Sequence, residues 1–188
     1  MTICTQHRVC LFGEIINNKV MLNDAGNMIT MLWNEMPSRF NHIELDEYIV
    51  MPNHIHGIIV ISPRRGESCI RPNDDVDNRN QGEHGNQGEH RNQGEHKVRP
   101  YGGGGGHHHP CGTKEGSLGR IVQAFKSIST HAYINGVKQW GWRPFAGVVW
   151  QRNYWEHIVR DEQDLNRLRE YIRHNPEKWA LDELMVVH

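Results

Sequence analysis

Residues 48–61 read Tyr-Ile-Val-Met-Pro-Asn-His-Ile-His-Gly-Ile-Ile-Val-Ile, two apolar runs joined by Pro52-Asn53. Short runs rich in Ile and Val that are bounded by Pro and Asn are typical of strands. The pattern therefore predicts strands over Ile43–Met51 and His54–Ser62, with the chain bent or bulged at Pro52-Asn53.

Two histidines, His54 and His56, stand one residue apart in this stretch. Alternate residues of a strand share a face, so these side chains project together while Ile55 and Ile59 project the other way. Apolar residues on both faces indicate a central, buried strand. Two imidazoles at this spacing can share one divalent ion. An isolated His-x-His is more often a pair of packed histidines, so the motif alone leaves both interpretations open.

The residues upstream predict a strand, a hairpin and a helix: Thr2–Thr5, Cys10–Ile16 with Lys19–Leu22 around Asn17-Asn18, and a helix from Asn23 or Asp24 to about Met36. Asparagine tolerates the left-handed backbone of a tight hairpin turn. An Asn or Asp side chain also caps a helix start, and Pro37 is expected to stop this helix.

The residues downstream predict a helix, a strand and a last helix: a helix capped by Ser117 and ending near Asn135-Gly136, a strand over Val148–Val159, and a helix over Glu162–His174 that Asp161 caps and Asn175-Pro176 ends. Strands, hairpins and helices in this order predict an α+β fold, with helices packed on an antiparallel sheet.

The chain has 188 residues and nearly balanced charge, with 21 Lys and Arg against 22 Asp and Glu. Residues 64–116 hold most of the glycines, a period-six repeat (Asn-Gln-Gly-Glu-His) and almost no large apolar side chains. Such a segment cannot offset its ordering entropy, which predicts a flexible insertion in one domain over 1–180, followed by a tail at 181–188. The insertion's histidines leave a metal-scavenging role open.

Composition excludes some function classes. A net charge of −1 excludes a strongly basic DNA-coating protein, but it allows a nucleic-acid enzyme with a local Arg-lined groove. No run of 18 apolar residues, no signal-peptide pattern and no zinc-ligand spacing among the four cysteines is present. We therefore expect a reduced, cytoplasmic protein without a membrane partner.

A second informative segment, residues 165–176, lies in the last predicted helix. Tyr171 and Asn175 are four residues apart, so they are neighbours at the edge of its apolar stripe. Taken alone, the tyrosine is typical of a packing residue and the asparagine of a helix stop.

Together the two segments resemble the HUH single-strand endonucleases, and most closely the REP-associated tyrosine transposases, which have a single catalytic tyrosine. The motifs that carry the resemblance follow in the family's order: Thr2-Ile-Cys-Thr-Gln, Leu11-Phe-Gly-Glu-Ile, Met51-Pro-Asn-His-Ile-His-Gly-Ile, Ala124-Phe-Lys-Ser, Trp150-Gln-Arg-Asn-Tyr-Trp-Glu-His-Ile and Tyr171-Ile-Arg-His-Asn-Pro. The chain departs from the pattern in its long insertion at 64–116 and in starting inside the first expected strand.

The resemblance implies a ferredoxin-like antiparallel sheet and a divalent metal, Mg²⁺ or Mn²⁺, held by His54, His56 and the Asn175 side-chain oxygen. It implies that Tyr171 is the nucleophile, that the substrate is single-stranded or hairpin DNA, and that cutting leaves a 5′-phosphotyrosine link. The protein is expected to act as a monomer or a homodimer. Tyrosine is a poor nucleophile at neutral pH without help, which is consistent with a metal in the site.

Other residues have weaker assignments. Lys126 and Arg152 lie inside the resembling motifs and are candidates for phosphate contacts, with solvated surface charge as the alternative. Glu156 and His157 are candidates to support the metal ligands. Tyr154 is the rival nucleophile.

The sequence also bears on two other functions. A two-histidine phosphoesterase is excluded because no histidine is followed at the second position by Ser or Thr. A hairpin DNA-binding regulator that no longer cuts remains open.

Overall fold

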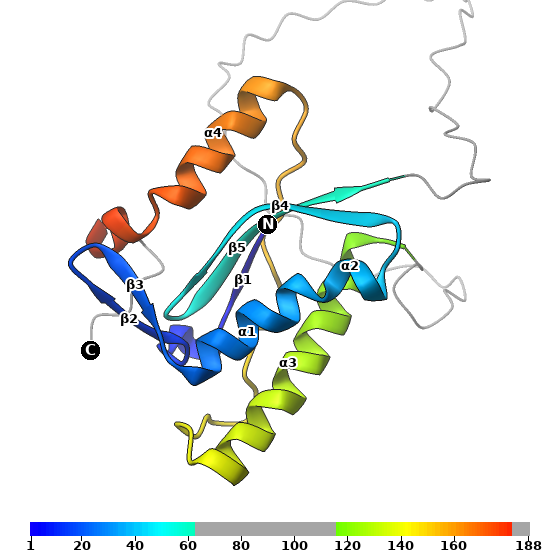
Figure 1. The fold of residues 1–188 in the computed structure, drawn as a ribbon. Coiled ribbons are helices and arrows are strands. Elements are labelled where there is room, and N and C mark those ends of the chain that lie inside the picture. Colours follow the sequence, from blue (N-terminus) through cyan, green and yellow to red (C-terminus); the bar gives the residue numbers. More distant parts are fainter. Residues whose placement is uncertain (63–115, 182–188) are drawn as a thin grey trace, which may run out of the picture. The chain divides into compact units, whose positions relative to one another are not determined.

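The computed structural model describes residues 1–62 and 116–181. Its elements, labelled in Figure 1, are β1 (Thr2–Cys4), η1 (Gln6–Arg8), β2 (Gly13–Ile16), β3 (Lys19–Leu22), α1 (Asp24–Asn34), α2 (Met36–Arg39), β4 (Ile43–Met51), β5 (His54–Ile61), α3 (Leu118–Trp140), α4 (Glu162–Arg173) and η2 (Pro176–Leu181). The predictions for the insertion, apart from Gly116, and for the tail after residue 181 lie outside the described residues.

The central structure is a three-stranded antiparallel sheet in the order β1-β5-β4. In its register, Ile55 of β5 lies opposite Ile3 on one side and Val50 on the other. The predicted α+β class, the antiparallel sheet and the central position of the histidine strand are therefore confirmed. Pro52-Asn53 forms the two-residue connection between β4 and β5, since Met51 pairs with His54.

The β2–β3 hairpin forms a separate two-stranded sheet around the predicted turn. Asn17 and Asn18 have φ values of 50° and 60°, the left-handed backbone that this tight turn requires. The Asn23 side chain accepts a hydrogen bond of 2.9 Å from the Gly26 amide and caps α1.

The hydrophobic core lies against one face of the three-stranded sheet. Helices α1 and α3 lie on this side of the sheet, and α4 lies on the other (Figure 1). Trp33 of α1 packs edge-on against Phe125 of α3, with ring centroids 5.1 Å apart. A Cβ atom on Gly57 of β5 would stand 2.6 Å from the Trp33 ring, so only glycine allows this approach.

Two predicted helix ends are wrong. Helix α3 continues through Asn135-Gly136 to Trp140, because Trp142 folds back so closely that a Cβ atom on Gly136 would stand 2.1 Å from its ring. Glycine at 136 thus serves packing, and Gly141, with φ 68°, ends the helix. Helix α1 ends at Asn34, and Pro37 lies in the first turn of the short helix α2.

The predicted strand Val148–Val159 is also wrong. This segment meets Thr2–Thr5 through two isolated bridges, Trp150 with Thr5 and Trp155 with Thr2, and through a hydrogen bond of 2.9 Å from the Gln151 amide to the Cys4 carbonyl. Between the bridges the Lys126 ammonium donates to three successive carbonyls, those of Gln151, Arg152 and Asn153, at 2.8, 3.2 and 3.0 Å. Carbonyls that bond an ammonium are not paired with β1, which explains why a regular strand does not form here.

None of the described helices carries an apolar stretch long enough to cross a bilayer.

Candidate active site

The two histidines of β5 lie side by side on the sheet face that α4 covers. His54 is fully buried and His56 is 5% exposed, and their ring centroids are 4.5 Å apart. Strand periodicity explains this arrangement, because the intervening Ile55 points into the core on the opposite face. The predicted juxtaposition of the rings is confirmed.

Each imidazole is fixed through its Nδ1 atom. His54 Nδ1 lies 2.7 Å from the Asn53 side-chain oxygen, and His56 Nδ1 lies 2.7 Å from the Thr2 hydroxyl. Because an amide oxygen only accepts, His54 carries its proton on Nδ1 and has a lone pair on Nε2. Engagement of Nδ1 by a neighbouring oxygen is the usual way in which a metal-binding histidine is oriented.

Asn175 brings a third polar side chain to the two rings. It is 1% exposed, and its Nδ2 lies 3.4 Å from His56 Nε2. Nε2 of His54 and Oδ1 of Asn175 are both buried, and neither has a hydrogen-bond partner among the described residues. Leaving such atoms unsatisfied is costly, and imidazole nitrogens with an amide oxygen are suitable donors for a divalent cation. The donor set therefore fits the implied metal.

The electrostatic environment keeps His54 neutral. The pKa of His54 is lowered to about 4, chiefly by burial, with a smaller contribution from the positive charge of Arg8 and an opposing one from the neighbouring Asn175. At neutral pH the ring is uncharged, which is the form that binds a metal.

Tyr171 lies at the edge of the same cluster. Its ring centroid is 5.2 Å from that of His56, and the residue is 40% exposed. Trp179 of η2 stacks on His54 from this side, with centroids 6.0 Å apart and planes inclined by 23°. The tyrosine thus contacts His56 and is also open to solvent, where a substrate can approach it.

Two ion pairs hold α4 against β4. Arg169 binds Asp46 with two hydrogen bonds, Nε to Oδ1 at 3.0 Å and Nη2 to Oδ2 at 2.6 Å, and Arg173 binds Glu47 at 2.7 Å. The Arg169 bonds hold the pKa of Asp46 below its usual range. We call these two pairs the ion-pair clamp.

The ion-pair clamp depends on an irregularity of β4. The register of β4 against β5 shifts between Leu45 and Tyr48, so both carboxylates lie at the bulge. Tyr171 lies between the two arginines in sequence, and Ile172 is the one buried residue of α4. Directional polar contacts therefore contribute much of what positions the tyrosine helix.

The structure brings together four of the predicted site residues: His54, His56, Tyr171 and Asn175. Lys126 and Arg152 are not part of this cluster. Lys126 bonds the three carbonyls described above, where burial lowers its pKa to about 8, and Arg152 is exposed on the same segment. Their proposed phosphate contacts stay a prediction.

The expected support from His157 is replaced by other residues. His157 pairs with Asp164 at 2.7 Å, and the oxygens that orient the two rings belong to Thr2 and Asn53. Sequence reasoning missed both, as well as Trp179. For Asn53 a signal existed, because it directly precedes His54 in the turn between the strands. Nothing in the sequence alone links Thr2 to residue 56.

The described residues contain no group of three or more His, Cys, Asp or Glu side chains that could hold a metal ion. The two histidines reach a set of three donors only with the Asn175 amide oxygen, so the candidate site combines imidazole and amide donors. Together with the tyrosine they define an α+β protein with a histidine, amide and tyrosine cluster on an antiparallel sheet.

Comparison with known proteins extends this description. The chain is 35% identical over 188 residues to a protein of Haemophilus influenzae described only as uncharacterized, and the match covers 99% of this chain and 83% of that protein. The chain belongs to the same family as this Haemophilus protein.

A second protein of Haemophilus influenzae, provisionally described as a REP-associated tyrosine transposase, is 43% identical over 37 residues. That match covers 20% of this chain and 21% of the other protein. No protein-family model matches the chain.

Proposed function

We propose that the protein is a metal-dependent, transposase-like endonuclease and strand transferase that cuts single-stranded DNA near hairpins. The observation that carries the proposal is the meeting of His54, His56, Asn175 and Tyr171 on one sheet face, with two buried polar atoms that have no hydrogen-bond partner among the described residues. The short similarity to a protein described as a REP-associated tyrosine transposase supports the same activity.

The metal would be held by the Nε2 atoms of His54 and His56 and by Oδ1 of Asn175. Mixed imidazole and oxygen donors suit Mn²⁺ and accept Mg²⁺. A bound divalent ion supplies Lewis-acid stabilisation of charge on a phosphodiester oxygen. Thr2 and Asn53 keep the two rings oriented with Nε2 toward Asn175.

Tyr171 supplies the nucleophile in this proposal. Its hydroxyl oxygen attacks the phosphorus, the bond from phosphorus to the 3′ oxygen breaks, and a 5′-phosphotyrosine link and a 3′-hydroxyl form. Because the link keeps the energy of the phosphodiester, a 3′-hydroxyl can reverse the step and rejoin a strand. The ion-pair clamp fixes the helix that carries the tyrosine, and such positioning is a large part of the rate in a reaction of this kind.

The test uses single-stranded hairpin oligonucleotides from the DNA that flanks the gene, incubated with Mn²⁺ or Mg²⁺. A denaturing gel is expected to show cut DNA and a covalent protein–DNA adduct, both lost in EDTA. The double substitution His54→Ala with His56→Ala should abolish cutting but leave hairpin binding within a few-fold, because phosphate and stacking contacts supply most of the affinity.

A matched control substitutes His157→Ala, which removes an exposed histidine that pairs with Asp164 outside the cluster. This variant is expected to cut normally. Full cutting by the double variant in EDTA would refute the proposed metal site. Hairpin binding without any cutting by the unaltered protein would instead favour a non-cleaving hairpin DNA-binding regulator.

A further inference from the structure

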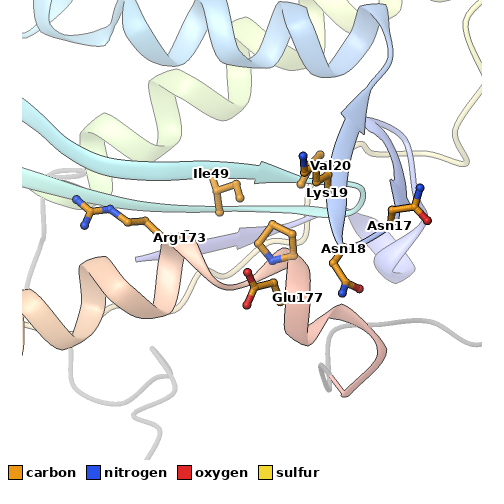
Figure 2. A pocket seen from close by; sticks show the side chains of 8 residues that line it. Asn17, Asn18, Lys19, Val20, Ile49, Arg173 and Glu177 are labelled. Carbon is orange, nitrogen blue, oxygen red and sulfur yellow. The ribbon is translucent and has the colours of Figure 1, made fainter.

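A cavity lies between the tip of the β2–β3 hairpin, strand β4 and the end of α4 with η2 (Figure 2). It is a shallow depression that is open to solvent, with a volume of about 470 Å³. The residues that line it include Asn17, Asn18, Lys19, Ile49, Pro176 and Glu177.

The cavity lies on the face of the sheet that carries the two histidines. Ile49 of β4 is the direct partner of His56 in the antiparallel register, and directly opposed residues share a face. At the other wall, Pro176 is the residue after Asn175. A strand of DNA whose phosphate reaches His56 and Asn175 therefore has this cavity beside its next nucleotides.

The lining combines apolar surface with polar edges. Val20, Ile49 and Pro176 provide apolar surface, while Asn17, Asn18 and Glu177 provide amide and carboxylate groups. Figure 2 shows the two asparagines at the hairpin turn and Glu177 on η2, and none of these three side chains hydrogen-bonds another described residue. An unpaired nucleobase has the same composition, with apolar ring faces and a polar edge of donors and acceptors.

The charges at the cavity also fit a nucleotide. Lys19 lines the cavity and has no carboxylate partner in the described part of the chain. Arg173, which is paired with Glu47, lines it from the end of α4. The Lys19 ammonium at this position suits the phosphates that flank a bound base.

The turn of the β2–β3 hairpin has asparagines at two positions where glycine is common. Asn17 and Asn18 both have left-handed backbone, and of the residues that tolerate this conformation, asparagine also supplies an amide. A glycine pair would form the same turn but leave the cavity without these donors and acceptors.

We propose that this cavity takes one unpaired nucleobase of the DNA strand, next to the phosphate that is cut, and thereby sets the position of cutting. The inference rests on the proposed function, because it assumes that a DNA strand occupies the neighbouring cluster.

The experiment uses the full chain and hairpin oligonucleotides from the DNA flanking the gene, each with a single abasic site at a different unpaired position. We expect one position at which loss of the base weakens binding and cutting on the order of ten-fold. The double substitution Asn17→Gly with Asn18→Gly preserves the turn and removes both amides. In this variant the intact strand should behave like the abasic strand, so the difference between them disappears.

A control variant, Lys138→Gln, removes an exposed charge near the end of α3 and should keep the abasic profile of the unaltered protein. Thermal unfolding of each variant checks that the fold is retained. The proposal is overturned if no unpaired position is sensitive to base loss, or if the glycine variant keeps the same profile. If the unaltered protein binds but never cuts, the proposed function fails, while the binding profile still decides whether the cavity holds a base.

Discussion

The two faces of the three-stranded sheet have different compositions and different roles. On one face, Ile3, Val50 and Ile55 are buried against the apolar core, to which α1 and α3 contribute. On the other face, His54 and His56 meet a helix that two ion pairs join to β4. Successive residues of strand β5 thus point alternately to the two faces. The face that packs on the apolar core is separate from the face that carries the polar side chains of the candidate site.

The largest expected effect is on the apolar face. Phe125→Ala removes a fully buried ring that packs on Trp33 and Trp150, and we expect the free energy of unfolding to fall by about 3–5 kcal/mol. Urea denaturation measures it. On the polar face, Tyr171→Phe removes only the hydroxyl from a ring that is 40% exposed. We expect this substitution to change the free energy of unfolding by less than about 0.5 kcal/mol. Similar losses from both substitutions would remove the distinction between the faces.

The second prediction concerns pH. The pKa of His54 is about 4 in the folded protein and near the ordinary 6.5 in the unfolded chain. Between these values the unfolded chain binds more protons, so stability is full above about pH 6.5 and falls as the pH is lowered toward 4. The expected loss is on the order of 3 kcal/mol across this window. Urea denaturation in EDTA at several pH values measures it.

His54→Gln provides the comparison for this pH dependence. The variant lacks the titrating ring, so its stability should fall less between pH 6.5 and 4, whereas His157→Gln, outside the cluster, should retain the full loss. Identical pH profiles for His54→Gln and the unaltered protein would show that another group is responsible.

The third prediction tests the ion-pair clamp. Asp46→Asn removes the charge that binds Arg169 but can still accept the hydrogen bond from the Glu47 amide at the bulge. We expect a small loss of stability and a cutting rate at saturating DNA that falls on the order of ten-fold, because the tyrosine is less well positioned. DNA affinity should remain nearly the same.

Glu35→Gln is the matched control, since it breaks an exposed ion pair with Arg39 that is outside the cluster. Its cutting rate should equal that of the unaltered protein. If both substitutions reduce cutting equally, the loss of a negative charge anywhere on the protein would explain the lower rate. The ion-pair clamp would then have no specific role.

The smallest effect is expected where neither face is altered. Ser62 and Gly116, the described residues on either side of residues 63–115, both bond to His42: its carbonyl accepts from the Ser62 amide at 2.8 Å, and its Nε2 lies 3.3 Å from the Gly116 carbonyl. A short Gly/Ser linker in place of residues 64–115 can therefore close this gap. The free energy of loop closure changes by only about 0.6 kcal/mol per doubling of loop length. We therefore expect the shortened protein to keep its fold and its cutting rate to change by less than about two-fold. Circular dichroism measures whether the fold is retained, and the cutting assay measures the rate. A loss of fold would show that the insertion is needed for the structure.

Local periodicity in the sequence was sufficient to predict most of the strands and helices, and to place the site residues in two separate pairs. The spacing of two between His54 and His56, and of four between Tyr171 and Asn175, was readable from the sequence. That these two pairs meet is a long-range property, and only the resemblance to the tyrosine transposases suggested it.

The features that sequence reasoning missed depend on contacts between distant residues. Arg169 finds Asp46 only because β4 is bulged, and the Val148–Val159 segment loses its strand geometry because Lys126 binds its carbonyls. Helix α3 passes Gly136 because Trp142 packs there. Each of these features depends on a residue outside the segment concerned, so local secondary-structure propensity cannot predict it.

The site of the covalent adduct tests most directly whether the polar face cuts DNA through Tyr171, as we propose. After reaction with a hairpin oligonucleotide, nuclease and protease digestion followed by mass spectrometry should find the nucleotide on the peptide that contains Tyr171. Tyr171→Phe should abolish the adduct, while Tyr154→Phe, a matched change in a ring packed beside Lys126, should keep it. An adduct on Tyr154 that survives Tyr171→Phe would contradict the account and place α4 outside the active site.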